Sequence, residues 1–164
     1  MPVRKIVSGG QTGVDRAALD AAGELGIPCG GWCPRGRGAE DGVVPAGYPM
    51  REAPSAAYPE RTALNVRDSE GTLVLTRGTP RGGTALTVSL ARRAARPVLV
   101  VDLDAGADVV RVRAWLVEND IHVLNVAGPR ESEAPGIHDR AVAFLRELLA
   151  GEDPGAASRS SGLL

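Results

Sequence analysis

Aromatic residues are scarce in this 164-residue chain, at 3% of the sequence, although hydrophobic residues make up 43%. The core must therefore consist mainly of alanine, valine and leucine. Cysteine is equally scarce, since Cys29 and Cys33 are the only two and provide no disulfide framework. No apolar run approaches the roughly 20 residues of a membrane-spanning helix, and the first apolar run is too short for a signal peptide. We therefore expect a cytoplasmic protein with no membrane partner.

An excess of charge is also lacking. The net charge is −1 and Lys5 is the only lysine, so the charge balance gives no reason to expect a nucleic-acid partner. The length suits one domain. We expect a single ligand-binding domain over residues 1–150, followed by a small, polar tail at 151–164 that is disordered.

Strand-like and helical patterns alternate along the chain. The strand-like runs are mostly continuous rather than alternating, as is typical of parallel strands buried on both faces. We expect strands at 3–8, 27–33, 72–76, 97–103 and 122–126, and helices at about 14–25, 59–70, 84–95, 107–119 and 137–150. This alternation predicts an α/β fold, a Rossmann-like doubly wound parallel sheet of about five strands with helices on both faces. The expected strand order is 2-1-3-4-5.

Between the second strand and the second helix lies a long segment rich in glycine and proline, from Pro34 to Pro59. Loops of this length are uncommon in compact domains and are usually functional lids or disordered.

Two glycine-rich loops, SGGQTGVD and TRGTPRGGT, follow the first and third predicted strands. In the expected order they flank the crevice where doubly wound sheets bind ligands. Each loop opens a helix, and Thr84 is well placed as an N-cap. Bare amides at Gly9–Gly13 and Gly82–Thr84 would suit a phosphate. The alternative is that these glycines only form tight turns.

Two carboxylates at helix ends have competing explanations. Asp15 in a first turn is explained by helix capping alone, but near an anion it would instead favour a ligand that carries hydrogen-bond donors. Asp68, on one helix face with Arg61 and Asn65, opposes the helix dipole, which points either to a salt bridge with Arg61 or Arg67 or to a ligand. The predicted ligand site comprises Gly9, Gly10, Gln11, Thr12, Gly13, Asp15, Arg16, Trp32, Arg35, Arg37, Glu40, Asp41, Asp68, Thr76, Arg77, Gly82, Gly83, Thr84, Asn125, Gly128 and Arg130.

Familiar cofactor motifs do not fit. SGGQTG is not GxGxxG, and the second strand ends in Trp-Cys-Pro-Arg rather than an acidic residue, which argues against NAD. No GK[ST] is present, so no P-loop ATP site is expected. Cys29 and Cys33 have histidines only far along the chain, which argues against structural zinc. His138 is a weak acid/base candidate.

Five stretches of the sequence carry a family resemblance. These stretches are SGGQTGVDRAALDAA, GGWCPRGRGAEDG, ERTALNVRDSEGTLVLTRG, GGTALT and LNVAGPRESEAPGI. Together they resemble the molybdenum carrier family, a YpsA-like group. The resemblance runs from about Val3 to Leu149. It implies a Rossmann-like homo-oligomer (dimer or tetramer), related to the LOG-type phosphoribohydrolases, with molybdenum cofactor as cargo. The LOG-type motif PGGxGTxxE reads RGGTALT here, so its catalytic glutamate falls at Thr87 or a near neighbour and is absent.

These observations favour a binding or carrier protein for a phosphorylated small molecule, with molybdenum cofactor as the cargo that the resemblance implies. Arg16, Arg35 or Arg77 would neutralise the phosphate, while Asp15, Asp41 and Asp68 would orient the organic part. One alternative is a nucleoside monophosphate N-glycosidase with a displaced carboxylate, at Glu40 or Asp68. Another is a nucleotide-sensing module.

Overall fold

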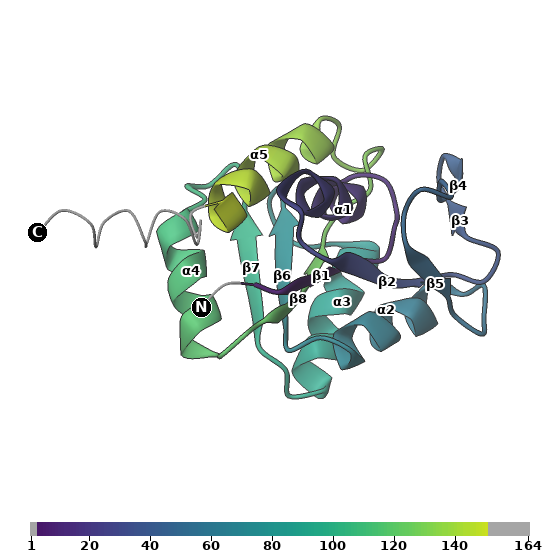
Figure 1. Cartoon of the computed structure of the whole chain (residues 1–164), viewed down its shortest axis with the longest axis horizontal. Coiled ribbons are helices and arrows are strands. Elements are labelled where there is room, and N and C mark those ends of the chain that lie inside the picture. The colour runs from purple at the N-terminus through teal and green to yellow at the C-terminus, as the bar shows by residue number, and fades with distance from the viewer. Residues whose placement is uncertain (1–2, 151–164) are drawn as a thin grey trace, which may run out of the picture.

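Residues 3–150 fold around a six-stranded parallel sheet flanked by five helices (Figure 1). These are the residues that this computed structural model describes, so the predicted disorder of 151–164 lies outside them. The α/β, Rossmann-like class predicted from the sequence is confirmed. The elements are β1 (Lys5–Val7), α1 (Val14–Leu25), β2 (Cys29–Cys33), β3 (Gly38–Ala39), β4 (Gly42–Val43), β5 (Met50–Glu52), α2 (Tyr58–Arg67), β6 (Gly71–Thr76), α3 (Gly82–Arg93), β7 (Val98–Asp102), α4 (Val109–Glu118), β8 (Val123–Ala127) and α5 (Ile137–Ala150).

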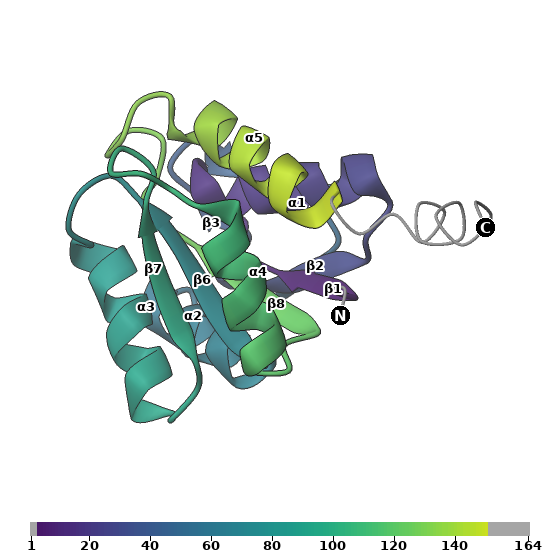
Figure 2. The ribbon, with the colours of Figure 1, turned by 90° about the vertical axis from the view of Figure 1, so that its left-hand side faces the viewer.

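The helices form two layers. On one face of the sheet α1 packs along α5, and α4 contacts α5; on the other face α2 packs against α3 (Figures 1 and 2). The buried face of α1 is rich in alanine, with Ala17, Ala18 and Ala21 fully buried. Because alanine has a small side chain, α1 can lie close to both α5 and the sheet. This packing explains how a chain with few aromatic residues still forms a dense core.

The central strands explain the continuous apolar runs of the sequence. Every residue of β6 is buried, because helices cover both faces of the sheet there. The main core lies between the sheet and the α1, α4 and α5 layer, and includes Ile6, Leu73 and Leu124. Within the described residues, no helix is long and apolar enough to cross a membrane.

The strand order differs from the predicted one. The sheet runs β5-β2-β1-β8-β6-β7, so the last strand lies between the first and third predicted strands, and these two are not neighbours. When the five long strands are counted from β6 onward, however, they become β6, β7, β8, β1 and β2, and their spatial order is 2-1-3-4-5. The predicted topology is therefore present, but the chain begins and ends at different strands from those expected. Its switch point lies between β6 and β8.

The long segment after β2 contains structure that the sequence patterns did not predict. β5 extends the sheet beside β2, with Arg51 opposite Trp32, and β3 and β4 form a separate hairpin. Arg37 secures this segment from a left-handed conformation (φ 59°). Its guanidinium donates hydrogen bonds to the carbonyls of Val44 and Tyr48, among others. The segment is thus held by its own backbone rather than by an apolar stripe.

Candidate functional site

A cavity of about 370 Å³ opens at the carboxyl ends of β6, β8 and β1. This is the edge at which open parallel sheets bind ligands, and the β6–β8 switch point falls inside it. The first turn of α3 forms one wall, and α2 supplies Tyr58, Arg61 and Asn65. We call this cavity the edge pocket. The predicted site residues that line it are Gly9, Gln11, Asp15, Gly82, Gly83, Thr84, Asn125, Gly128 and Arg130.

The start of α3 presents backbone amides to the edge pocket. The first amides to find a helical acceptor are those of Thr84 and Ala85, which both donate to the carbonyl of Arg81. Arg81 is therefore the N-cap, not Thr84 as predicted, and no side chain caps the helix. Gly82 and Gly83 come before the first amide donors of the helix, so their amides have no acceptor within it, and both residues line the pocket. Such a helix start is suited to an anion.

Arg61, on α2, is the buried cation of the edge pocket. Its Nη1 donates to the carbonyl of Gly9 at 2.5 Å and lies 3.6 Å from Oδ2 of Asp15. Among the described residues its Nε has no hydrogen-bond partner, so part of its bonding capacity is unused. A Cβ at position 9 would lie 2.0 Å from Arg61 Nη1. Glycine at position 9 is therefore what allows the guanidinium to approach the loop.

Asp15 is the buried anion of the same pocket and is only 7% exposed. Oδ2 accepts a hydrogen bond of 3.3 Å from the backbone amide of Gln11. Burial raises the pKa of Asp15 to about 6, although the charge of Arg61, the Gln11 amide and the charge of Arg16 act in the opposite direction. A carboxyl with this pKa can hold or release a proton near neutral pH.

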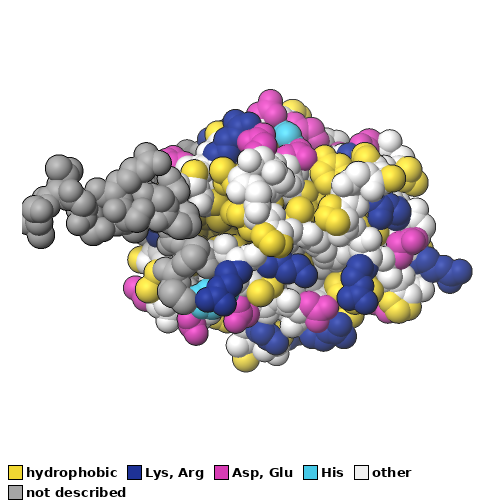
Figure 3. All heavy atoms as spheres, viewed as in Figure 1, with side chains coloured by type: hydrophobic (Ala, Val, Ile, Leu, Met, Phe, Trp, Pro, Cys, Tyr) yellow, Lys and Arg dark blue, Asp and Glu magenta, His cyan; other side chains and the backbone are white. Residues whose placement is uncertain are grey.

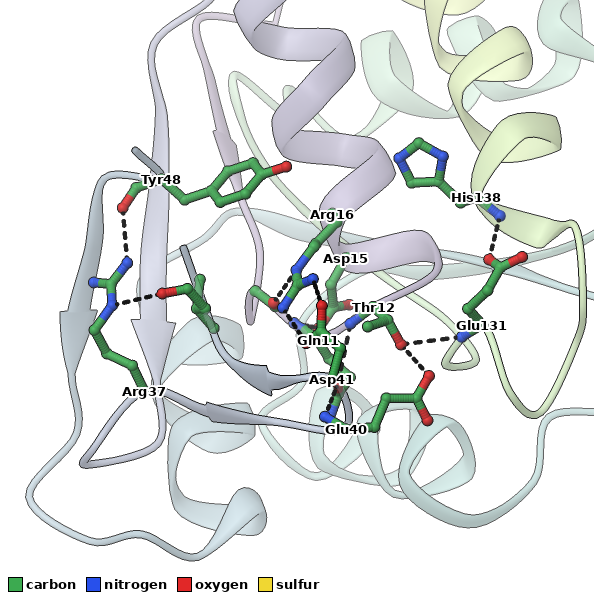
Figure 4. Close-up of polar contacts among 12 residues, drawn as sticks. Gln11, Thr12, Asp15, Arg16, Arg37, Glu40, Asp41, Tyr48, Glu131 and His138 are labelled. Atoms are coloured by element: carbon green, nitrogen blue, oxygen red, sulfur yellow. Dashed lines mark hydrogen bonds and ion pairs between the residues drawn. The ribbon is translucent and has the colours of Figure 1, made fainter. Parts of the chain in front are cut away.

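The hairpin residues Glu40 and Asp41 do not line the edge pocket but fasten the hairpin to it (Figure 4). Glu40 accepts hydrogen bonds from the hydroxyls of Thr12 and Ser132, and its own amide donates to Gln11 Oε1 at 2.9 Å. The bonds from Ser132 and Thr12 lower the pKa of Glu40. We call this set of contacts the Glu40 clasp.

Arg16 and Asp41 form the second attachment of the hairpin. Both terminal nitrogens of the Arg16 guanidinium bond the Asp41 carboxylate, while Nε donates to the Gly10 carbonyl at 3.1 Å. This pairing lowers the pKa of Asp41. The guanidinium is therefore occupied by protein groups and lies outside the edge pocket.

Asp68 and Trp32 pair with each other away from the pocket. The indole Nε1 donates to Asp68 at 2.7 Å, and Asp68 forms an ion pair of 2.8 Å with Arg67. The salt-bridge explanation of Asp68 is thus confirmed, with Arg67 rather than Arg61 as partner. Arg51 lies over the Trp32 ring, 4.6 Å from its centroid, and so covers one face of the indole.

The remaining predicted residues also lie outside the lining of the edge pocket. Arg77 donates to the Pro135 carbonyl at 2.7 Å and lies 3.7 Å from Asp104. Arg37 holds the insertion, and Arg35 is exposed. The others are buried backbone or strand-end positions in this region: Gly10, Gly13 and Thr76.

Several residues that line the edge pocket were not among those predicted from the sequence, notably Tyr58, Arg61, Asn65, Thr87 and Glu133. The sequence pattern could have indicated two of them, because Arg61 and Asn65 share one face of the second predicted helix. Asp68, on the same face, was predicted instead, and the structure places it at the C-cap of α2. The LOG-type glutamate position falls at Thr87 or a near neighbour, and the Thr87 hydroxyl donates to the Gly83 carbonyl at 3.0 Å.

Histidines and side chains of the kinds that bind metals also occur in the part of the chain that the structure describes. No group of three or more histidine, cysteine, aspartate or glutamate side chains could hold a metal ion there. His138 lies in a second hollow of about 520 Å³, where its Nε2 is 2.7 Å from Asp20. On the face drawn in Figure 3, arginines and carboxylates are interspersed.

Together, the sheet topology and the edge pocket describe a Rossmann-like domain with a cavity at its switch point. The model of the circularly permutated YpsA SLOG family matches residues 6–149, and the chain belongs to this family. A circular permutation also accounts for the strand order, which is regular only when counted from β6.

A solved structure supports the same placement. The crystal structure of "Putative molybdenum carrier protein" from Syntrophus aciditrophicus SB is similar to this chain, with a TM-score of 0.84 and 44% sequence identity. The similarity covers 90% of this chain and 94% of the other. No curated protein matches the chain.

Proposed function

We propose that the protein binds a phosphorylated small molecule in the edge pocket and carries it, with molybdenum cofactor as the cargo. The observation that carries this proposal is the pairing of the α3 start with Arg61 around one cavity. The similar protein from Syntrophus aciditrophicus SB is named as a molybdenum carrier, which supports the choice of cargo. A cavity of about 370 Å³ also falls within the range of about 300–1,000 Å³ that is common for small-molecule sites.

In this proposal the phosphate binds at the first turn of α3. The amides of Gly82 and Gly83 donate to its oxygens, and the helix dipole favours its charge. Arg61 and Arg130 line the same cavity and replace Arg16, Arg35 and Arg77 as the cations that neutralise it. Charge-assisted hydrogen bonds of this kind are roughly twice as strong as neutral ones.

The organic part of the ligand lies against the polar side chains deeper in the pocket. Asp15 and Asn125 are buried and line the cavity, and they offer acceptors to the N–H groups of a pterin ring. A carboxyl group suits this position in an anion-binding loop, because its carbonyl oxygen can accept from hydrogen-bond donors of the ligand. The homo-oligomeric state and the cytoplasmic location remain predictions.

The test is to load the protein with molybdenum cofactor released anaerobically from a molybdoenzyme, then to desalt it. Molybdenum is counted by mass spectrometry and pterin by fluorescence after oxidation. The key variant is Gly83→Val, since a Cβ at position 83 meets no atom within 4 Å and projects from a residue that lines the pocket. The added side chain should therefore block the ligand without disturbing the fold.

Gly23→Val is the matched control, because its Cβ also meets no atom within 4 Å but Gly23 lines the second hollow. We expect near-stoichiometric molybdenum and pterin with the wild type and with Gly23→Val, and almost none with Gly83→Val. If neither component elutes with the wild type, the cargo is wrong.

One observation favours the N-glycosidase alternative. Asp15 is a carboxyl with a raised pKa beside Arg61 in the pocket, whereas Glu40 and Asp68, the candidates from the sequence, do not line it. An enzyme of this kind would use Asp15 as its acid or base. Incubation with nucleoside monophosphates at pH 6 would then release free base with the wild type and none with Asp15→Asn. Absence of released base would exclude this alternative for the substrates tested.

A further inference from the structure

When a ligand is bound as proposed above, Arg61 lies between two negative charges. These are the carboxylate of Asp15 and the anionic group of the ligand. Nη1 of Arg61 is 3.6 Å from Asp15, both side chains are about nine-tenths buried, and both residues line the edge pocket. In a buried setting of this kind, like charges interact strongly because little water screens them. An anion that binds beside Arg61 therefore acts directly on Asp15.

The other charged groups around Asp15 cannot take over from Arg61. From its own helix, Arg16 is occupied by Asp41 and the Gly10 carbonyl. From the segment after β8, Arg130 bonds Glu133 at 2.6 Å, and both line the pocket with Tyr58 of α2. Arg61 is the largest influence that lowers the pKa of Asp15. A ligand anion that neutralises Arg61 removes this influence and adds a repelling charge.

We propose that Asp15 takes up one proton when a phosphate-like anion binds beside Arg61, so that the edge pocket holds its ligand more tightly in acid than in alkaline solution. This inference rests on the proposed function and deepens it, because it gives the site a means of release. Protonation removes the repulsion between Asp15 and the bound anion. A rise in pH restores that repulsion and weakens the complex.

The size of the effect follows from linkage. In the ligand-free protein Asp15 has a pKa of about 6. In this proposal its pKa is higher in the complex. Between these two values the dissociation constant rises by up to about tenfold per pH unit, since each complex must hold a proton that the free protein has released. Below pH 6 the affinity does not depend on this group.

Sulfate is the probe for this inference, because it mimics phosphate and remains a dianion throughout the pH range used. Its dissociation constant is measured from pH 5 to pH 8 by titration of the wild type and of Asp15→Asn. The asparagine has the same shape and can still accept the bond from the Gln11 amide. In parallel, the titration of the Asp15 carboxyl is followed by ¹³C NMR, with and without saturating sulfate.

We expect wild-type affinity for sulfate to fall by up to about tenfold per pH unit between pH 6 and the pKa of Asp15 in the complex, and the affinity of Asp15→Asn to stay nearly constant. The pKa of Asp15 should rise when sulfate is bound. Sulfate binding that is independent of pH in the wild type, with an unchanged Asp15 titration, would overturn this inference and leave the anion site intact. Failure of sulfate to bind at any pH would contradict the anion site and therefore both proposals.

Discussion

At the scale of single residues, Asp15 makes the folded protein less stable than it would be with a neutral side chain at neutral pH. The carboxyl is buried, and burial raises its pKa to about 6 in spite of Arg61. The sequence leaves open whether Asp15 serves helix capping or a ligand. The structure places it in the first turn of α1 and also in the lining of the edge pocket. A residue that lowers stability in a cavity is best explained by a role in binding.

This view predicts the stability of Asp15→Asn. The folded-state pKa of Asp15 lies above the ordinary carboxyl value, so the folded protein keeps a proton that the unfolded chain loses between about pH 4 and pH 6. Wild-type stability should therefore fall as the pH rises through this window, by about 3 kcal/mol. Asp15→Asn lacks this loss. Urea unfolding of both proteins at pH 4.5 and pH 7.5 should show the variant gaining about 2 kcal/mol relative to the wild type between these two pH values.

An equal difference between the two proteins at both pH values would mean that Asp15 titrates normally. The carboxyl would then be better hydrated than the structure indicates. The proposed role of Asp15 in ligand release would also be contradicted.

The predicted glycines Gly9, Gly82 and Gly83 line the edge pocket, whereas most of the predicted arginines do not. Glycine-rich turns that open helices are visible in the local sequence. Arginine is the usual basic residue of this chain, so its presence near a predicted loop says little. Arg61 meets the Gly9 carbonyl across 52 positions of sequence. Only the folded chain reveals which arginine reaches the pocket.

At the scale of elements, the β3–β4 hairpin is attached to the walls of the edge pocket. The Glu40 clasp joins it to Thr12 and Gln11 after β1 and to Ser132 after β8. Glu40 also lies 3.8 Å from Arg130, which lines the pocket. The hairpin therefore holds two pocket loops together from outside, and none of its residues lines the cavity.

Glu40→Ala tests this role. Loss of the charge-assisted bonds should lower the free energy of unfolding by about 1–2 kcal/mol and should speed hydrogen exchange in residues 10–13 and 130–133. The pKa of Glu40 is lowered, so its contribution is present at neutral pH and is lost as the pH falls through the folded-state pKa. Glu118→Ala, at an exposed position on α4, is the matched control. Unchanged exchange at both loops would show that the hairpin is merely adjacent.

The elements with buried apolar residues were predictable, whereas β3, β4 and β5 were not. Helical periodicity and continuous apolar runs arise from burial on fixed faces, and the five helices and five central strands follow them. β3, β4 and β5 have only two or three residues each and are largely exposed. They are held by backbone pairing and by Arg37, and neither cause leaves a hydrophobic pattern in the sequence.

At the scale of the whole molecule, the permuted order of strands is what the sequence concealed. Periodicity shows that a strand exists but not which strand it pairs with, and β8 inserts between β1 and β6. Nine of the predicted site residues nevertheless line the edge pocket. All loops that follow parallel strands lie at one edge of the sheet, so the glycine loops meet there whichever order the strands adopt.

The central claim is that an anion binds at the start of α3 beside Arg61. The most direct test is a titration of ¹⁵N-labelled protein with inorganic phosphate, followed through the backbone amide signals. We predict saturable shifts at Gly82 and Gly83, with no comparable change around Gly23 and His138 in the second hollow. Shifts confined to the second hollow, or no saturable shift at Gly82 and Gly83, would contradict the account.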